Sequence, residues 1–285
     1  MQPETLIRVG FATGTTVALL VLYHLLQRVV SPKHTVSVDM RGKNTAYQLV
    51  QSCHVLAVLL LVPGIVQEAL THKSVTGGAL WATAFAALGL ALIQFAGWIG
   101  IQLLLRSSLE NELQRGNAAA GVAAGANYIA IGILASRTIA GSDLRGLGLS
   151  VAFFCIAVAS LALFVALFRA LTVYDDAEQI QGENLAAALS YTGITIAVAI
   201  VLTRALKGDF ESWKTSLLGY GLVAAGALAL YPVRQLFVQG LILGRRPTLR
   251  GGALDQSIGV ERNLGMATME ALAYVATAIA IAELS

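Results

Sequence analysis

Charged residues are scarce in this chain of 285 residues: Asp, Glu, Lys and Arg make up 12% of it, whereas 56% of its residues are hydrophobic. A soluble globular domain needs far more charged surface, so that class of protein is excluded. The formal net charge of +3 is too small to identify a partner. The densest basic cluster, Arg245, Arg246 and Arg250, is too short for nucleic acid and suits an anchor at the membrane interface.

Cysteine and histidine are equally sparse. The two cysteines, Cys53 and Cys155, lie in apolar stretches, which excludes a disulfide framework and a cysteine metal site. The four histidines lack the spacing of metal ligands, and no glycine-rich phosphate loop is present. We therefore expect no cofactor, no metal and no enzymatic activity. A membrane-embedded enzyme acting on lipid is a disfavoured alternative, because no paired catalytic groups occur near one interface.

Long apolar runs are abundant, and the mean hydropathy is +0.73. Membrane β-barrels alternate apolar and polar residues instead, so the runs predict an all-α, polytopic transmembrane bundle. The first run has no small-residue cleavage site and is expected to remain as a membrane helix. Kinks are expected at Pro63 and at Tyr231-Pro232. The eight predicted spans cover residues 5–26, 44–67, 79–105, 117–139, 147–168, 184–206, 213–243 and 263–281.

A short motif begins four of these spans: an Asn followed by small residues, after a charged segment. The motif residues are Asn44, Asn117, Asn184 and Asn263, at spacings of 73 (117 − 44), 67 (184 − 117) and 79 (263 − 184) residues. One unit is thus a helix, a charged connector and an Asn-led helix, and four such units insert as parallel repeats. In pairs they predict two tandem four-helix modules, residues 1–140 and 141–285, with a boundary near Gly141.

Lys and Arg divide unequally between the two expected membrane faces. Twelve lie on the face of the connectors and seven on the opposite face. Because cytoplasmic loops are enriched in Lys and Arg, the connectors are predicted to be cytoplasmic and both termini periplasmic.

The sequence resembles the YjfL-like family of bacterial inner-membrane proteins, a domain family of unknown function. The segments that resemble it most are residues 31–34 (SPKH), 41–46 (RGKNTA) and 115–120 (RGNAAA). The resemblance covers essentially the whole chain as two tandem four-helix copies, and it departs at Asn263, where Leu264 and Gly265 replace an Ala pair. It implies the fold and a bacterial inner-membrane location, but no reaction.

The four motif Asn residues have a structural and a functional interpretation. Asn is among the best acceptors for the free backbone N–H groups at a helix N-terminus, and the small residues that follow permit close helix packing. The functional interpretation depends on the residues at offsets 4, 7 and 11, which share a helical face with each Asn and are mostly polar or small. Such a face should point into the bundle.

Glu270 is the most distinctive residue on these faces. It follows Asn263 by seven residues, which places it roughly 10 Å into the membrane, where a carboxyl group is costly and often functional. It could instead be protonated and hydrogen-bonded to Tyr or Thr. The complete candidate intramembrane polar site is Glu270, His54, Gln51, Asn127, Tyr191, Thr195 and Tyr274.

Two functions are compatible with these residues, and the first is the leading interpretation. In the first, the bundle is a channel or transporter for a small ion, with protons plausible because His54, Gln51 and Glu270 could form a polar relay if their helices meet. In the second, it is a non-transporting scaffold or subunit in the lipid bilayer, with connectors that bind a soluble cytoplasmic partner. A water-accessible path to Glu270 and His54 would favour transport, and a dry, closed bundle would favour the scaffold. Homo-oligomer formation stays open.

Overall fold

The computed structural model describes residues 3–70, 75–105, 107–138, 143–207 and 210–284. Within these ranges the secondary structure is helical, and eight helices are long and apolar enough to cross a membrane. The chain is therefore an all-α, multi-pass membrane protein. The predicted module boundary at Gly141 and the predicted end of the fourth span at Ile139 lie outside the described residues.

Each of the four units has the expected order. The first helix of a unit is called here its accessory helix, and the short helix before the Asn is its connector helix. The accessory helices are α1 (Pro3–Val30), α5 (Val75–Leu104), α8 (Leu144–Ala170) and α11 (Trp213–Ala225) with its continuation. The connector helices are α2 (Val36–Arg41), α6 (Leu109–Gln114), α9 (Asp176–Gln181) and α13 (Ala253–Asp255), the last extended by η3 (Gln256–Val260). The Asn-led helices are α3 (Thr45–Leu59), α7 (Ala118–Thr138), α10 (Leu185–Ala205) and α14 (Leu264–Leu284).

Both expected irregularities occur where proline was expected to cause them. The second span is divided into α3 and α4 (Val62–Ala69), and Pro63 lies in the first turn of α4, where its missing N–H costs no helical hydrogen bond. The seventh span passes from α11 through η1 (Gly226–Ala229) and α12 (Leu230–Val233), which contains Pro232, to the wider helix η2 (Arg234–Ile242). These changes of helix type let the backbone bend while it stays hydrogen-bonded.

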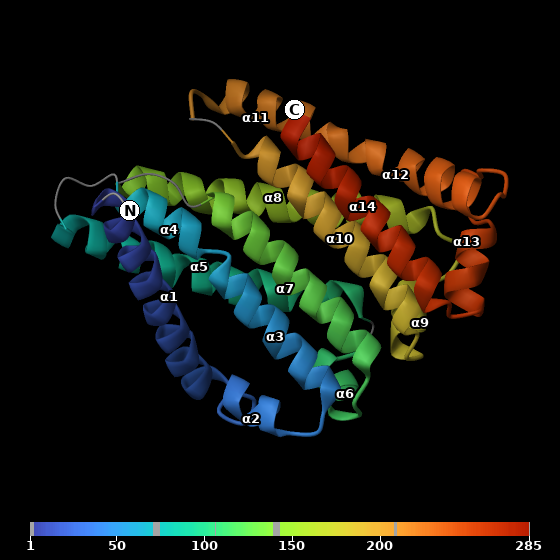
Figure 1. The fold of residues 1–285 in the computed structure, drawn as a ribbon, viewed down its shortest axis with the longest axis horizontal. Coiled ribbons are helices and arrows are strands. Elements are labelled where there is room, and N and C mark those ends of the chain that lie inside the picture. The colour runs from blue at the N-terminus through green and yellow to red at the C-terminus, as the bar shows by residue number, and fades with distance from the viewer. Residues whose placement is uncertain (1–2, 71–74, 106, 139–142, 208–209, 285) are drawn as a thin grey trace.

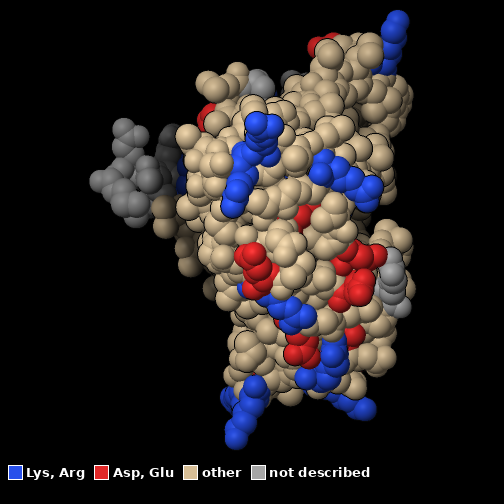
Figure 2. Space-filling view, turned by 90° about the vertical axis from the view of Figure 1, so that its right-hand side faces the viewer, with Lys and Arg blue, Asp and Glu red and all other residues tan. Residues whose placement is uncertain are grey.

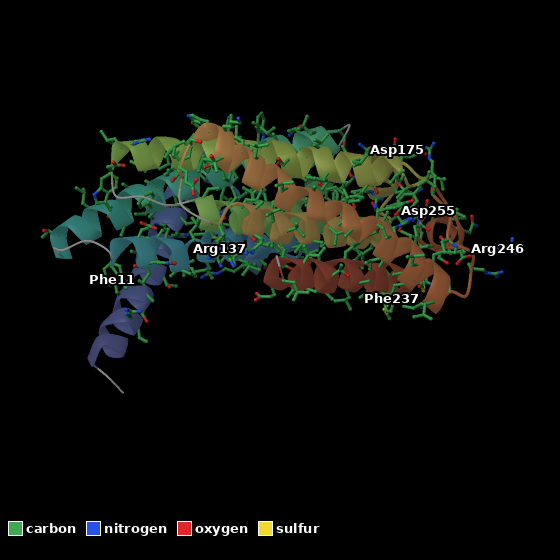
Figure 3. The ribbon with its side chains drawn as sticks, turned by 90° about the horizontal axis from the view of Figure 1, so that it is seen from above. Phe11, Arg137, Asp175, Phe237, Arg246 and Asp255 are labelled. Carbon is green, nitrogen blue, oxygen red and sulfur yellow. The ribbon has the colours of Figure 1, made fainter. Side chains whose placement is uncertain are left out.

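The Asn-led helices form a row in the order α3, α7, α10 and α14, and each packs against the next (Figure 1). Accessory helices α5, α8 and α11 contact the Asn-led helix of their own or the preceding unit. The connector helices lie on the side of the molecule where the Asn-led helices begin, here called the connector end, and both chain termini lie toward the opposite side (Figure 1). Figure 3 shows Asp175, Asp255 and Arg246 at the connector end, with Arg137 and Phe11 away from it.

Small residues permit the close contacts within the row. A Cβ atom added to Gly125 of α7 would lie 2.6 Å from the Cys53 Sγ atom of α3, and one added to Gly193 of α10 would lie 2.3 Å from the Ala271 Cα atom of α14. Both distances are shorter than a real carbon contact. In a bilayer, where apolar side chains gain little from leaving lipid, such backbone proximity is a main source of helix association.

Candidate functional site at the connector end

The motif Asn residues cap their helices and also join neighbouring units. The Oδ1 atoms of Asn44 and Asn184 each accept hydrogen bonds from two backbone N–H groups in the first helical turn, and those of Asn117 and Asn263 each accept one. The structural interpretation of the motif therefore fits all four copies. The side-chain amide nitrogen has a different role, which capping alone does not explain.

That nitrogen, Nδ2, donates to a carbonyl of the connector helix in the following unit. Asn44 donates to Leu113 O at 2.6 Å, Asn117 to Ile180 O at 2.8 Å, and Asn184 to Ile258 O at 2.9 Å. We call these three contacts the cross-repeat hydrogen bonds. They couple the start of each Asn-led helix to the next connector, so the connectors are held at fixed positions relative to one another.

Ion pairs add to the coupling between the second and third units. Arg115 pairs with Glu112 in its own unit and with Glu183 Oε1 in the next, at 3.2 Å. Burial raises the pKa of Glu112, but hydrogen bonds from Arg115, Asn117 and Ser107 outweigh this effect and lower it overall. Glu112 is thus an ionised acceptor that fixes both the motif Asn and the arginine beside it.

In the first unit, the predicted residues Gln51 and His54 face the accessory helix α1. Gln51 accepts a hydrogen bond from Gln27 Nε2 at 2.8 Å and donates one to Asp39 Oδ2 at 2.9 Å. The His54 ring lies between two tyrosines, with its centroid 4.2 Å from that of Tyr128 and 4.8 Å from that of Tyr23. This histidine is buried among aromatic rings, which fits a packing role.

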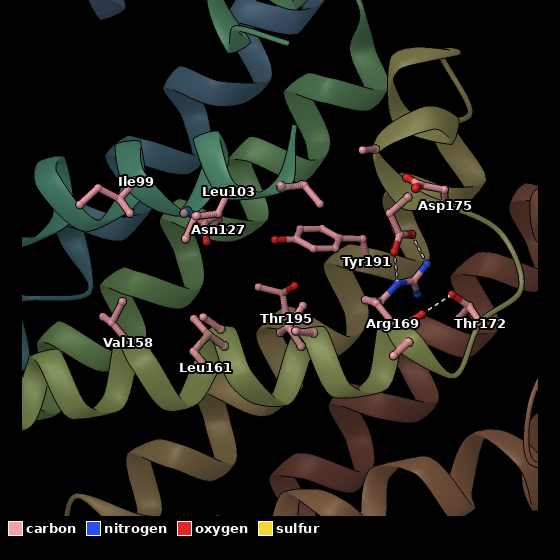
Figure 4. Close-up of a pocket in the computed structure, with 18 of the residues that line it drawn as sticks. Ile99, Leu103, Asn127, Val158, Leu161, Arg169, Thr172, Asp175, Tyr191 and Thr195 are labelled. Atoms are coloured by element: carbon pink, nitrogen blue, oxygen red, sulfur yellow. Dashed lines mark hydrogen bonds and ion pairs between the residues drawn. The ribbon is translucent and has the colours of Figure 1, made fainter. Parts of the chain in front are cut away.

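The second and third units place Asn127, Tyr191 and Thr195 on a cavity of about 660 Å³ (Figure 4). It lies between α5 and α8 and is lined largely by aliphatic side chains. Asn127 Nδ2 donates to Gly97 O of α5 at 3.0 Å, and Thr195 of α10 is 1% exposed. At the connector end of the cavity, Arg169 forms an ion pair with Asp176 and donates to Ser190 Oγ at 3.1 Å.

In the fourth unit, Glu270 is 1% exposed and forms an ion pair with Arg234 of η2. The same guanidinium pairs with Asp255 of α13, whose other oxygen accepts from Val173 N at 2.9 Å. The partner of Glu270 is therefore an arginine from another helix, and not the Tyr or Thr considered from the sequence. Tyr274, one turn further along α14, is buried as well.

The relay suggested by the sequence requires the helices of His54 and Glu270 to meet, and they do not. His54 is on α3 and Glu270 is on α14, with α7 and α10 between them in the row (Figure 1). The predicted polar residues therefore form separate clusters. One lies in the first unit, one lies on the cavity of the second and third units, and one lies in the fourth unit. The condition for a relay through His54, Gln51 and Glu270, that their helices meet, is therefore not fulfilled. The position of a residue along its helix does not give the distance between helices.

Sequence reasoning missed Arg169, Arg234, Asp176 and Asp255 as cluster members. The arginines were counted only as charges at the membrane face. A signal was present for the two aspartates, since each precedes the Asn of its unit by eight residues (184 − 176 and 263 − 255). A search for acids at equal offsets in the connectors would have selected this pair.

Comparison with known proteins identifies the family of this chain. The model of the family described as Domain of Unknown Function (DUF350) matches this chain twice, over residues 2–139 and 142–284. The chain belongs to this family. The two matches confirm the family resemblance that the motif indicated. They also confirm that the chain contains two tandem copies.

The curated proteins include a similar sequence, described as a UPF0719 transmembrane protein, from Aquifex aeolicus (strain VF5). It is 28% identical over 130 residues, which cover 43% of this chain and 48% of the relative. The chain thus spans about half the length of the curated relative it matches. No solved structure matches the chain.

Proposed function

We propose that this protein is a scaffold or subunit of the bacterial inner membrane, whose four parallel units present a fixed polar surface to a soluble cytoplasmic partner. The observation that supports this best is the set of cross-repeat hydrogen bonds. Because they hold the connectors in place, a partner binding there would not have to order them, and preorganised surfaces bind with a smaller entropic cost. The proposal places both termini in the periplasm and includes no enzymatic step.

The charges exposed on the connectors support a protein partner. Figure 2, which views the molecule from the side of α9 and α13, shows Lys and Arg interspersed with Asp and Glu on this face. Exposed residues here include Glu178, Glu183, Arg245, Arg246 and Arg262. A surface with both signs offers electrostatic complementarity, which gives specificity for one partner.

The burial of the two titratable candidates also favours the scaffold. Glu270 is 1% exposed and His54 is 7% exposed, and neither lines the cavity between α5 and α8. A group that exchanges ions needs contact with water along a path. In the scaffold, the clusters around these residues instead fix accessory and connector helices to the Asn-led helices.

Ion transport is the second candidate, and one observation favours it. The cluster of Arg234, Asp255 and Glu270 combines one base with two acids, and both Arg234 Nη1 and Glu270 Oε2 are buried without a hydrogen-bond partner among the described residues. A proton or a water molecule would satisfy an orphan carboxylate oxygen. Protons are therefore the ion we propose for this alternative.

Proton flux through purified protein in liposomes separates the two functions. For the scaffold we expect wild type and Glu270→Gln to dissipate a pH gradient no faster than protein-free liposomes. We also expect Arg234→Met to lower stability by about 3–5 kcal/mol in detergent, because it leaves two buried acids without their base.

Flux above the protein-free level that is lost in Glu270→Gln would overturn the scaffold and support transport. A second experiment tests the partner surface. The double variant Arg245→Glu/Arg246→Glu should bind a co-purifying soluble protein less well than wild type, with unchanged thermal stability. Equal binding by this variant would remove that part of the connector surface from the proposal.

A further inference from the structure

The contacts between successive units follow one pattern, which can be stated by counting residues from each motif Asn. Position +8 of an Asn-led helix packs on position +9 of the preceding one. Gly125 lies against Cys53 in this way, and Ala271 lies against Gly193. Position +15 similarly packs on position +13, as Gly132 does on Ala57. Because the same offsets recur at both ends of the row, the interface is a property of the repeat.

The row has two ends, and each presents half of this interface. Asn263 caps α14, but within the described residues its Nδ2 atom donates no hydrogen bond, unlike that of the other three motif residues. At the opposite end, Met40 is the residue four positions before its Asn, as Leu113 and Ile180 are in the following units. The Met40 residue is exposed. The last unit therefore has an unused donor, and the first unit has the corresponding acceptor.

The side chains on the two end faces are complementary in size. On α14, positions +2, +9 and +13 are Gly265, Leu272 and Ala276, all exposed. Position +4 packs on position +2 of the preceding helix, as Gly121 does on Ala46. On α3, the positions that would pack against the three α14 residues, +4, +8 and +15, are Gln48, Ser52 and Leu59. Each of the three pairs combines one large residue with one small residue. Internal pairs consist of two small residues. At the ends of the row, each large residue on one face would meet a small residue on the other, so the two faces could still pack closely.

Charge is complementary as well. Between the second and third units, Arg115 at position −2 pairs with Glu183 at position −1 of the next unit. The same positions meet between the third and fourth units, where a Cβ atom on Gly182 would lie 3.7 Å from Arg262 Nη2. At the ends of the row, position −2 is Glu261 and position −1 is Lys43, both exposed. Their charges are those of the Arg115–Glu183 pair with reversed sign.

The accessory helix of the first unit lacks the neighbour that the others have. Helix α8 contacts both α7 and α10, and α11 contacts the preceding Asn-led helix α10, whereas α1 contacts α3, α4 and α5 of the first two units. Of the eight candidate spans, the one in α1 is the least buried. A preceding Asn-led helix would cover its free side.

We infer that a second copy of this chain supplies that helix: α14 of one copy packs on α3 and α1 of the next, and Asn263 donates to Met40 O across the contact. All units share one orientation, so both copies insert in the same direction. The contact is head-to-tail, and repetition of it gives a ring or a filament. This inference rests on the proposed scaffold function for its biological use, but the contact itself does not depend on a soluble partner.

Cysteine crosslinking between differently tagged chains tests the contact. In a background of Cys53→Ala and Cys155→Ala, Ser52→Cys is placed in one chain and Leu272→Cys in the other. Co-expression and mild oxidation in membranes should give the mixed dimer. Leu163→Cys on α8, which is exposed but away from both ends, replaces Leu272→Cys in the control pair and should give no dimer.

Exchanging the charges of Glu261 and Lys43 tests the same contact with a pair of variants that should rescue each other. Glu261→Lys should reduce the yield of the mixed dimer by about two- to fivefold, as for a surface ion pair, and Lys43→Glu in the partner chain should restore it. Absence of the mixed dimer in chains of wild-type thermal stability, or dimers only between two Leu272→Cys chains, would overturn the inference. Flux that supports transport together with the mixed dimer would reject the scaffold function and retain the contact.

Discussion

At the residue scale, the side-chain amide of the motif Asn combines two roles. Its oxygen accepts from the first turn of its own helix, and its nitrogen donates to the next connector. Ser, Thr or Asp would cap the helix equally well. The cross-repeat hydrogen bond therefore gives Asn a second role in the first three units, which capping alone would not require.

Replacement of Asn by Asp separates the two roles. Asn184→Asp keeps the capping oxygen but turns a second oxygen toward the Ile258 and Gly259 carbonyls, so we expect a loss of roughly 1–3 kcal/mol. Asn263→Asp is the matched control and should cost nothing, because in a monomer its nitrogen has no acceptor among the described residues. Thermal unfolding of monomeric protein in detergent measures both. Equal losses would contradict a role for the amide nitrogen.

The buried arginine clusters show what single-residue reasoning can and cannot provide. Glu270 was identified as an unusual carboxyl group from its position in an apolar run. Its pairing with Arg234 depends on the fold, because 36 residues and several changes of helix type separate the two. Charged residues inside a bundle are stable only with a partner, so Glu270 predicts that a partner exists without showing which one.

At the element scale, the row of Asn-led helices depends on missing side chains. The distances around Gly125, Gly132 and Gly193 allow the backbones to approach more closely than any Cβ atom would permit. This explains why these helices have so little amphipathic character: both faces of α7 and α10 are covered by protein. For the middle helices, small residues rather than apolar ones mark the interface.

A pair of glycine substitutions tests this packing. Gly193→Ala would bring a methyl group within 2.3 Å of the Ala271 backbone and force α10 and α14 apart, at a cost of roughly 1–3 kcal/mol. Gly219→Ala on α11 meets nothing within 4 Å and should stabilise that helix by about 0.5–1 kcal/mol. Unfolding in one detergent compares them. A neutral Gly193→Ala would show that the two helices can separate without loss.

At the scale of the whole molecule, the even number of spans puts both termini at the end opposite the connectors. The excess of Lys and Arg on the connectors predicts that this end is cytoplasmic. The structure does not determine this orientation, because nothing in the packing of the helices distinguishes the two sides of a membrane. The orientation therefore stays a prediction from charge.

Labelling in intact cells tests the orientation. With Cys53 and Cys155 replaced, a membrane-impermeant maleimide should react with Lys214→Cys from outside and should reach Arg246→Cys only after the cells are opened. Both positions are exposed, so accessibility does not favour one of them. The reverse pattern would invert the topology and move the proposed partner surface to the periplasm.

The sequence by itself determined the eight spans, the four parallel units, the Asn caps and the family, because these depend on local quantities: the length of an apolar run, the spacing of a motif and the chemistry of a helix end. Only the tertiary structure decided which polar groups meet. It separated His54 from Glu270, paired Glu270 with Arg234, and gave the motif amides their acceptors in the next unit. Such contacts depend on the order and tilt of packed helices, which small residues permit at many positions and which no single stretch of sequence specifies.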